Sequence, residues 1–179
     1  MGSATEPTNE ADMSDDLLYD VRDGIGRVTF NRPQARNALT FAMYERLAAI
    51  CEEINAGAAV KALIVTGAGD KAFAAGTDIG QFRDFKGAED GLAYEAKMDR
   101  IIDTVERCRV PTIAAIAGAC TGGGAAIAAA CDLRIAAANA RFGFRCVWVN
   151  RANLPDEYPE FAPVAVVRDL ASLPSLTLA

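Results

Sequence analysis

Apolar residues in the first four-fifths of the chain follow two periodicities, one typical of strands and one typical of helices. Residues 17–30 predict two strands joined by a turn at Asp23 and Gly24, because apolar residues alternate in the second of them. Thr40 is a good helix N-cap, and Gly57 is expected to end the helix that follows, over about residues 40–56. The apolar face of this helix comprises Phe41, Tyr44, Leu47, Ala48, Cys51 and Ile54.

Three short apolar runs further along the chain predict more strands, at residues 60–66, 112–117 and 133–137. Helices are expected between and after them, at about residues 89–108 and 122–130, whereas residues 67–70 form a loop. Strands that alternate with helices indicate an α/β fold with buried sheets. In the longer of these helices, the residues expected to face the core are Leu92, Met98, Ile102 and Val105.

The two ends of the chain lack these patterns. Residues 1–16 contain five acidic residues and no basic one, which predicts a disordered acidic tail. Residues 145–179 contain four of the seven prolines and the only tryptophan, Trp148, without helical or strand periodicity. We therefore divide the chain into an acidic tail, a core at residues 17–144 and a C-terminal tail at residues 145–179.

Composition excludes several classes of function. The net charge is −6, and without the acidic tail the 18 basic residues face 19 acidic ones, so the basic surface that nucleic acid requires is missing. The chain has no histidine, which excludes His-based triads and His metal sites; we expect no metal. Five cysteines without CxxC spacing indicate reduced thiols. No signal peptide is recognisable, so a cytoplasmic location is expected.

One uncharged stretch, residues 110–131, is long enough to span a bilayer. Much of it is alanine and glycine, and Pro111 lies near its start. Because these residues provide little hydrophobic driving force, we predict no membrane span.

Two glycine-containing loops carry the candidate chemistry, at residues 73–79 and 118–124. Glycine lets the backbone approach a ligand closely, and the first N–H groups of a helix lack partners within that helix. Two N–H groups from separate loops can bind one carbonyl oxygen and stabilise the negative charge that develops on it. The alternative, that these glycines only permit tight turns and close helix packing, remains open.

The order of four motifs resembles that of the crotonase (enoyl-CoA hydratase/isomerase) superfamily. Asn31-Arg-Pro33 with residues 35–39 is similar to its first acyl-CoA-contacting segment, and Phe73-Ala-Ala-Gly76-Thr77-Asp78-Ile79 to its second. Gly118 with residues 122–124 is similar to its third, and residues 131–136 continue the pattern. The resemblance covers about residues 17–144, and it implies an α/β crotonase-like ββα spiral.

The resemblance also implies a function. An acyl-CoA thioester would bind with its carbonyl oxygen between the backbone N–H groups of Thr77 and Gly123, which we expect to face one cavity about 5 Å apart or less. Coenzyme A is then part of the substrate, and no separate cofactor is expected. The family assembles as trimers or hexamers, so the resemblance implies a homo-oligomer, but one weakened here because the family's C-terminal helical region is not recognisable. The nucleotide end of CoA would lie near Gln34, Ala35 and Arg36, and the pantetheine near Ala75, Asp78 and Ile79.

Two acidic residues have structural interpretations. Asp78 is as well suited to capping a helix as to contacting a ligand. Asp132 is expected to be held by local hydrogen bonds rather than to take part in chemistry.

Three departures from the family pattern weaken the hydratase interpretation. Ala126 stands where the hydratases have a glutamate, and Phe144, Arg145 and Cys146 occupy the region of a second one. The C-terminal helical region that completes the acyl pocket and the oligomer is not recognisable. A truncation, a frameshift or genuine divergence would each explain the loss of pattern after Phe144. A catalytically inactive acyl-CoA binder, or a relic, is therefore the second hypothesis.

A third hypothesis comes from a different class. Residues 65–72 match the glycine pattern of NAD(P)-binding dehydrogenases, G-x-G-x-x-A after a strand. That fold requires a helix to open at these glycines.

Overall fold

The computed structural model describes residues 16–143, 147–149 and 165–167. The chain divides into two units between Phe142 and Gly143. The second unit contains two short strands that pair in parallel, β9 (Val147–Val149) and β10 (Ala165–Val167), and neither was predicted. The acidic tail, except for Asp16, and most of residues 145–179 lie outside the described residues.

The larger sheet of the first unit has five strands in the order β1-β2-β3-β5-β7. The first two form an antiparallel hairpin, and the remaining pairs are parallel. Asp23 and Gly24 have positive φ values of 52° and 80°, as a tight two-residue hairpin turn requires. The strands are β1 (Leu17–Arg22), β2 (Ile25–Phe30), β3 (Ala62–Gly67), β5 (Thr112–Ile116) and β7 (Leu133–Ala136).

A second, smaller parallel sheet consists of β4 (Ala72–Ala74), β6 (Ala119–Cys120) and β8 (Arg141–Phe142). Each of its strands directly follows a strand of the larger sheet, and α2 (Ala88–Glu106) and α3 (Gly123–Ala130) lead back to the next pair. The repeated unit is therefore strand, strand, helix, which confirms the predicted ββα spiral. Strands of two or three residues are too short to leave a periodic signal, so the smaller sheet was not predicted.

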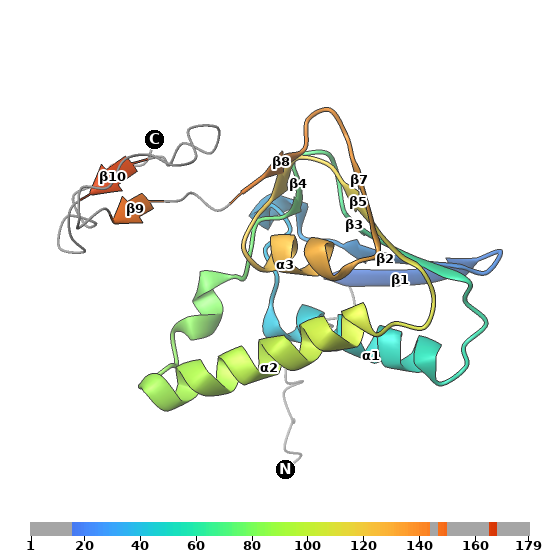
Figure 1. Cartoon of the computed structure of the whole chain (residues 1–179), viewed down its shortest axis with the longest axis horizontal. Helices are drawn as coiled ribbons and strands as arrows, with labels where there is room; N and C mark the ends of the chain where they lie inside the picture. The colour runs from blue at the N-terminus through green and yellow to red at the C-terminus, as the bar shows by residue number, and fades with distance from the viewer. Residues whose placement is uncertain (1–15, 144–146, 150–164, 168–179) are drawn as a thin grey trace, which may run out of the picture. The chain divides into compact units, whose positions relative to one another are not determined.

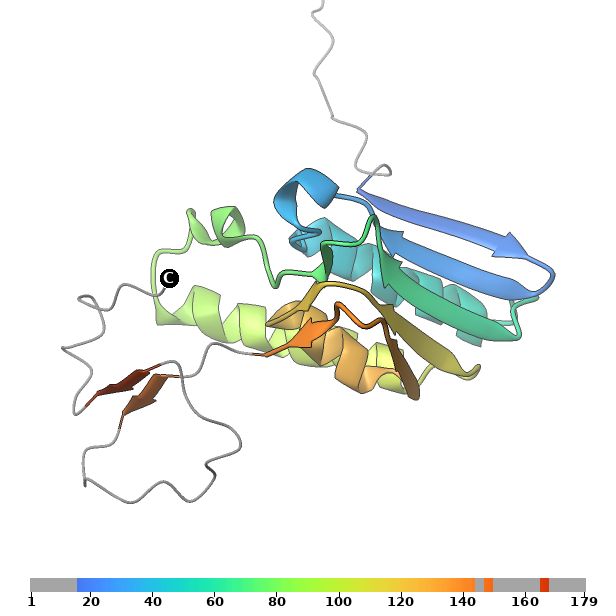
Figure 2. The ribbon, with the colours of Figure 1, turned by 90° about the horizontal axis from the view of Figure 1, so that it is seen from above.

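The helices lie close to where the sequence places them. α1 spans Phe41–Asn55, and the Thr40 hydroxyl caps it by accepting a hydrogen bond from the Met43 N–H at 3.3 Å. Gly57 follows its end with a φ of 115°. α1 and α2 pack against each other below the larger sheet (Figures 1 and 2). Two 3-10 helices, η2 (Pro33–Ala35) and η3 (Ile79–Phe82), complete the described helices.

One prediction about the core is wrong. Leu92 was expected to face the core, but its side chain is 70% exposed. The N-terminal end of α2 extends beyond the larger sheet in both views (Figures 1 and 2). Ile101, which was not predicted, is fully buried together with Val105 in the half of α2 that runs below the sheet.

Two alternatives from the sequence can be judged on this fold. Residues 110–131 contain β5, β6 and α3, and none of the described helices is long and apolar enough to cross a membrane. Gly67 ends β3, and the chain continues through Gly69 into β4 and not into a helix. The geometry of a dinucleotide-binding dehydrogenase is therefore absent at residues 65–72.

Candidate active site

Two loops meet backbone to backbone at Gly76 and Gly122. A Cβ atom added to Gly122 would lie 3.2 Å from the Gly76 α-carbon, and one added to Gly124 would lie 2.5 Å from the Ala74 carbonyl oxygen. The Thr121 N–H donates to that same carbonyl at 3.1 Å. The glycines thus permit an approach that larger residues would block, and this approach brings Thr77 next to the start of α3.

The N–H groups of Thr77 and Gly123 make no hydrogen bond to a protein acceptor within the described part of the chain. Thr77 lies opposite Leu39 in an isolated parallel bridge. Its two hydrogen bonds run from the Leu39 N–H to the Gly76 carbonyl and from the Asp78 N–H to the Leu39 carbonyl. The Thr77 N–H therefore points away from Leu39. Gly123 is the first residue of α3, where an N–H has no partner within the helix.

A buried tyrosine, Tyr44, links the two loops. Its hydroxyl lies 2.8 Å from the Thr77 hydroxyl, which lies 3.0 Å from the Tyr94 hydroxyl. A Cβ atom on Gly123 would be 1.8 Å from the Tyr44 oxygen and 3.3 Å from the Thr77 oxygen. The sequence predicted Tyr44 only as a core residue, because helical periodicity does not distinguish a phenol from other apolar rings.

The segment after β2 is joined to the loop at residues 75–78 by backbone hydrogen bonds. The Ala75 N–H donates to the Arg36 carbonyl at 3.1 Å, and the Leu39 N–H donates to the Gly76 carbonyl at 2.8 Å. Asn37 is fully buried and supports the same region through its side chain. Its amide donates to the Ala68 and Ala72 carbonyls at 3.0 and 2.7 Å, and its oxygen accepts from the Arg32 N–H at 3.0 Å.

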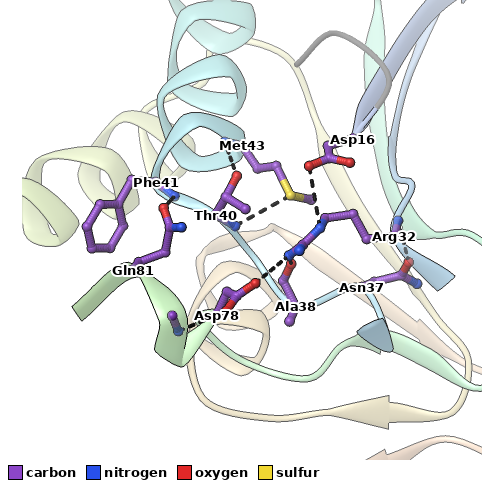
Figure 3. Close-up of polar contacts among 10 residues, drawn as sticks. Asp16, Arg32, Asn37, Ala38, Thr40, Phe41, Met43, Asp78 and Gln81 are labelled. Carbon is purple, nitrogen blue, oxygen red and sulfur yellow. Dashed lines mark hydrogen bonds and ion pairs between the residues drawn. The ribbon is translucent and has the colours of Figure 1, made fainter. Parts of the chain in front are cut away.

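Asp78 has both of its carboxylate oxygens engaged within the protein (Figure 3). One accepts from the Gly80 N–H at 2.9 Å and caps η3, and the other pairs with the Arg32 guanidinium at 2.9 Å. The Gly80 N–H first, and then Arg32, hold the pKa of Asp78 below its ordinary value. The capping interpretation of Asp78 therefore describes what this side chain does in the structure.

The residues predicted to contact the ends of CoA lie on the surface around these loops. Gln34 and Arg36 are exposed on and after η2, Ala35 is half-buried, and Ile79 is 84% exposed. A pocket of about 340 Å³ is lined by Gln34, Arg36 and Lys71 among others. A neighbouring pocket of about 420 Å³ is lined by Arg36, Lys71 and Arg141 and also by Asp70, so three cationic side chains and one acidic one surround this surface.

Ala126 lies three residues after Gly123 on α3 and is exposed. Residues three apart share a helix face. The Ala126 methyl group therefore occupies the position near the Gly123 N–H where the hydratases are expected to have a glutamate. Asp132, by contrast, accepts from the Thr112 N–H at 2.8 Å and from its hydroxyl at 2.9 Å, which lowers the pKa of this carboxyl. Its expected structural role agrees with these bonds. Phe144, Arg145 and Cys146 lie outside the described residues.

A family model described as enoyl-CoA hydratase/isomerase matches residues 20–148. This chain belongs to the enoyl-CoA hydratase/isomerase family. It is 40% identical over 116 residues to the short-chain-enoyl-CoA hydratase of Clostridium acetobutylicum, covering 65% of this chain and 44% of that protein. It is 36% identical over 131 residues to the crotonyl-CoA hydratase of Syntrophomonas wolfei, covering 72% and 49%. The chain thus spans about half the length of the curated relatives it matches.

Solved structures of the family give the same picture. An enoyl-CoA hydratase/carnithine racemase from Magnetospirillum magneticum superimposes with a TM-score of 0.69 at 39% identity, over 82% of this chain and 54% of that one. An enoyl-CoA hydratase from Bacillus anthracis gives a TM-score of 0.67 at 34% identity, over 73% and 50%. The crotonase-like fold class predicted from the motifs is therefore confirmed.

Proposed function

We propose that this chain binds an acyl-CoA thioester and holds its carbonyl oxygen between the backbone N–H groups of Thr77 and Gly123. The observation that supports the proposal is the close approach of Gly76 to Gly122, the residues directly before Thr77 and Gly123, whose N–H groups lack protein acceptors within the described residues. Donors fixed in this way stabilise an enolate oxygen because they need no reorganisation when charge develops.

The CoA portion would lie along the surface on either side of this site. The cationic side chains of Arg36, Lys71 and Arg141 suit the phosphates of the nucleotide end, close to Gln34 and Ala35. The exposed Ile79 offers an apolar contact to the pantetheine beside Ala75. Asp78 would support this contact by fixing η3, since its carboxylate is already paired.

A catalytically inactive acyl-CoA binder is the second candidate, and Ala126 favours it. Hydration of an enoyl thioester needs a group that activates water and a group that protonates the α-carbon, and each contributes about 10²–10⁴-fold. The methyl group of Ala126 can do neither. A polarised carbonyl without an acid or base close to it would give binding with little turnover. A cytoplasmic location, and a trimer or hexamer weakened by the loss of the family's C-terminal pattern, remain predictions.

A matched pair of ligands tests the proposal. Butyryl-CoA and the thioether S-butyl-CoA differ in the carbonyl oxygen, so calorimetric titration of the full chain isolates the contribution of the two N–H groups. We expect the thioester to bind about tenfold more tightly or better, as two net hydrogen bonds provide. Equal affinities would reject the oxyanion hole, and no binding of either ligand would reject acyl-CoA recognition.

A crotonyl-CoA hydration assay on the same preparation separates the two candidates. Loss of the enoyl absorbance at a rate well above the uncatalysed one would show a hydratase. Binding without turnover would support the inactive binder. Replacing Ala126 with Glu then tests whether an acid at that position restores hydration.

A further inference from the structure

The two edges of the larger sheet differ in charge. Among the described residues the sheet ends at β1 on one side and at β7 on the other (Figure 2). On β1, Asp20 and Arg22 form an exposed ion pair at 3.4 Å, and charged side chains commonly protect an edge strand from pairing with another chain. β7 has one charged residue, Arg134, and its guanidinium donates to three carbonyl groups at the C-terminal end of α3. The β7 edge therefore lacks this protection.

All four residues of β7 are exposed, and two of them are large and apolar. Leu133 and Ile135 are 56% and 63% exposed. They alternate with Arg134, whose side chain reaches α3, so they lie on the sheet face opposite this helix. Ile113 on β5 lies opposite Leu133 on the same face and is half-buried, so the apolar surface continues inward from the edge. An apolar row beside an open edge favours pairing with a further strand.

The backbone of β7 offers hydrogen-bonding groups at this edge. The Ala137 N–H donates to the Ile116 carbonyl at 2.8 Å, so the backbone of residue 137 faces β5. Backbone groups of successive residues in a strand point to opposite sides, so those of Ile135 also face β5, whereas those of Arg134 and Ala136 face the open edge. No strand pairs with β7 on that side within the described part of the chain. Two N–H groups and two carbonyl groups are thus placed for another strand.

We propose that a second copy of this chain binds at this edge, with β7 paired antiparallel to the partner's β7 about a two-fold axis at Ile135. Arg134 of each copy then lies opposite the partner's Ala136, and each such pair exchanges two hydrogen bonds, which makes four across the interface. Ile135 lies opposite its own counterpart in a pair without hydrogen bonds, with α-carbons about 4.5 Å apart, so the two side chains touch. The two five-stranded sheets become one continuous sheet.

Charge favours both this occupant and this register. An axis at Arg134 would place two arginines directly opposite each other, which is destabilising, whereas an axis at Ile135 places each arginine opposite an alanine. The Arg134 guanidinium remains bonded to its own α3. Asp132, directly before β7, is bonded to Thr112 of its own copy. A second copy therefore meets neither a like charge nor an unpaired one, and isoleucine packs on isoleucine. This association does not depend on acyl-CoA binding.

Sedimentation velocity of the full chain over a concentration series tests the proposal. A four-residue strand makes a small interface, so we expect a monomer–dimer equilibrium with a dissociation constant of about 10–100 μM. Ile135→Lys places two ammonium groups opposite each other and removes the apolar contact, so the constant should rise at least about 100-fold. Ala136→Pro removes an N–H that faces the open edge and not β5, so the constant should rise about tenfold.

Leu18→Lys is the matched control, because Leu18 is 43% exposed on β1, at the opposite edge of the same sheet. Its dissociation constant should stay within about twofold of the wild-type value. A wild-type monomer throughout the series would overturn the inference, as would a trimer or a dimer that Ile135→Lys leaves unchanged. Equal weakening by Leu18→Lys and Ile135→Lys would count against β7 as the contact. If Ala136→Pro does not fold, the exposed position 135 still decides the outcome.

Discussion

The segment around Arg32, Asn37 and Asp78 is held by polar side chains, whereas glycines in residues 118–124 approach other backbone segments too closely for a side chain. In the first segment the Asn37 amide and the Asp78 carboxylate form hydrogen bonds with backbone groups (Figure 3). In the second, a Cβ atom on Gly118 or Gly124 would overlap the backbone of Lys71 or Ala74. The first segment is therefore weakened by removing atoms, and the second by adding them.

The largest effect is expected from adding one methyl group at Gly118. A Cβ atom there would lie 2.1 Å from the Lys71 carbonyl oxygen, at a φ of 65°. We expect Gly118→Ala to reduce the free energy of unfolding by about 4 kcal/mol, from overpacking and left-handed strain together. Gly69→Ala is the matched control, because its φ is 76° and nothing lies within 4 Å. It should cost only about 1 kcal/mol in chemical denaturation, and equal losses would show that the close approach is not what requires Gly118.

A somewhat smaller loss is expected from removing the Asn37 side chain. Asn37 has a φ of 55°, so Asn37→Gly deletes three hydrogen bonds without adding backbone strain. We expect urea denaturation to show a loss of about 2–3 kcal/mol. Asp23→Gly, at an exposed position with a φ of 52°, is the control and should change stability by less than about 0.5 kcal/mol. If Asn37→Gly behaves like its control, polar side chains do not hold the first segment.

The smallest effect is expected at Asp78, where the ion pair is partly exposed. Asp78→Asn should cost about 1 kcal/mol at pH 7. The folded pKa of Asp78 lies below its ordinary 3.8, so its contribution is complete above that pH and is lost as the pH falls through the folded value. Denaturation curves at pH 7 and pH 3 should thus show a smaller difference between wild type and variant at the lower pH. A difference that grows on acidification would contradict the assigned pairing.

The sequence predicts the second segment better than the first. Gly118 and Gly122 to Gly124 are conspicuous in an otherwise alanine-rich stretch, and their close approaches follow directly from having no side chain. The partners of Asn37 are Arg32, Ala68 and Ala72, two of which lie more than 30 residues away. No local pattern connects residues so far apart. The hydrogen bonds that join the Tyr44, Thr77 and Tyr94 hydroxyls were missed for the same reason, because these residues come from α1, a loop and α2.

Helices and long strands were predicted within a few residues, because amphipathic periodicity extends over several turns or pleats. The exception, Leu92, shows the limit of that signal, since periodicity indicates which face of a helix is apolar but not where the sheet beside it ends. The smaller sheet, which positions both glycine loops, is built from strands of two and three residues. Its existence depends on contacts between turns of the spiral and could not be predicted from local sequence.

The carbonyl stretching frequency of a bound thioester is the sharpest test of the proposed oxyanion hole. Butyryl-CoA labelled with ¹³C at the carbonyl can be followed by isotope-edited infrared difference spectroscopy in complex with the full chain. Two N–H donors fixed on one oxygen polarise the C=O bond, so we expect a band shifted to lower frequency than that of the same thioester in water. A bound thioester whose carbonyl band coincides with that in water would contradict the assignment of Thr77 and Gly123.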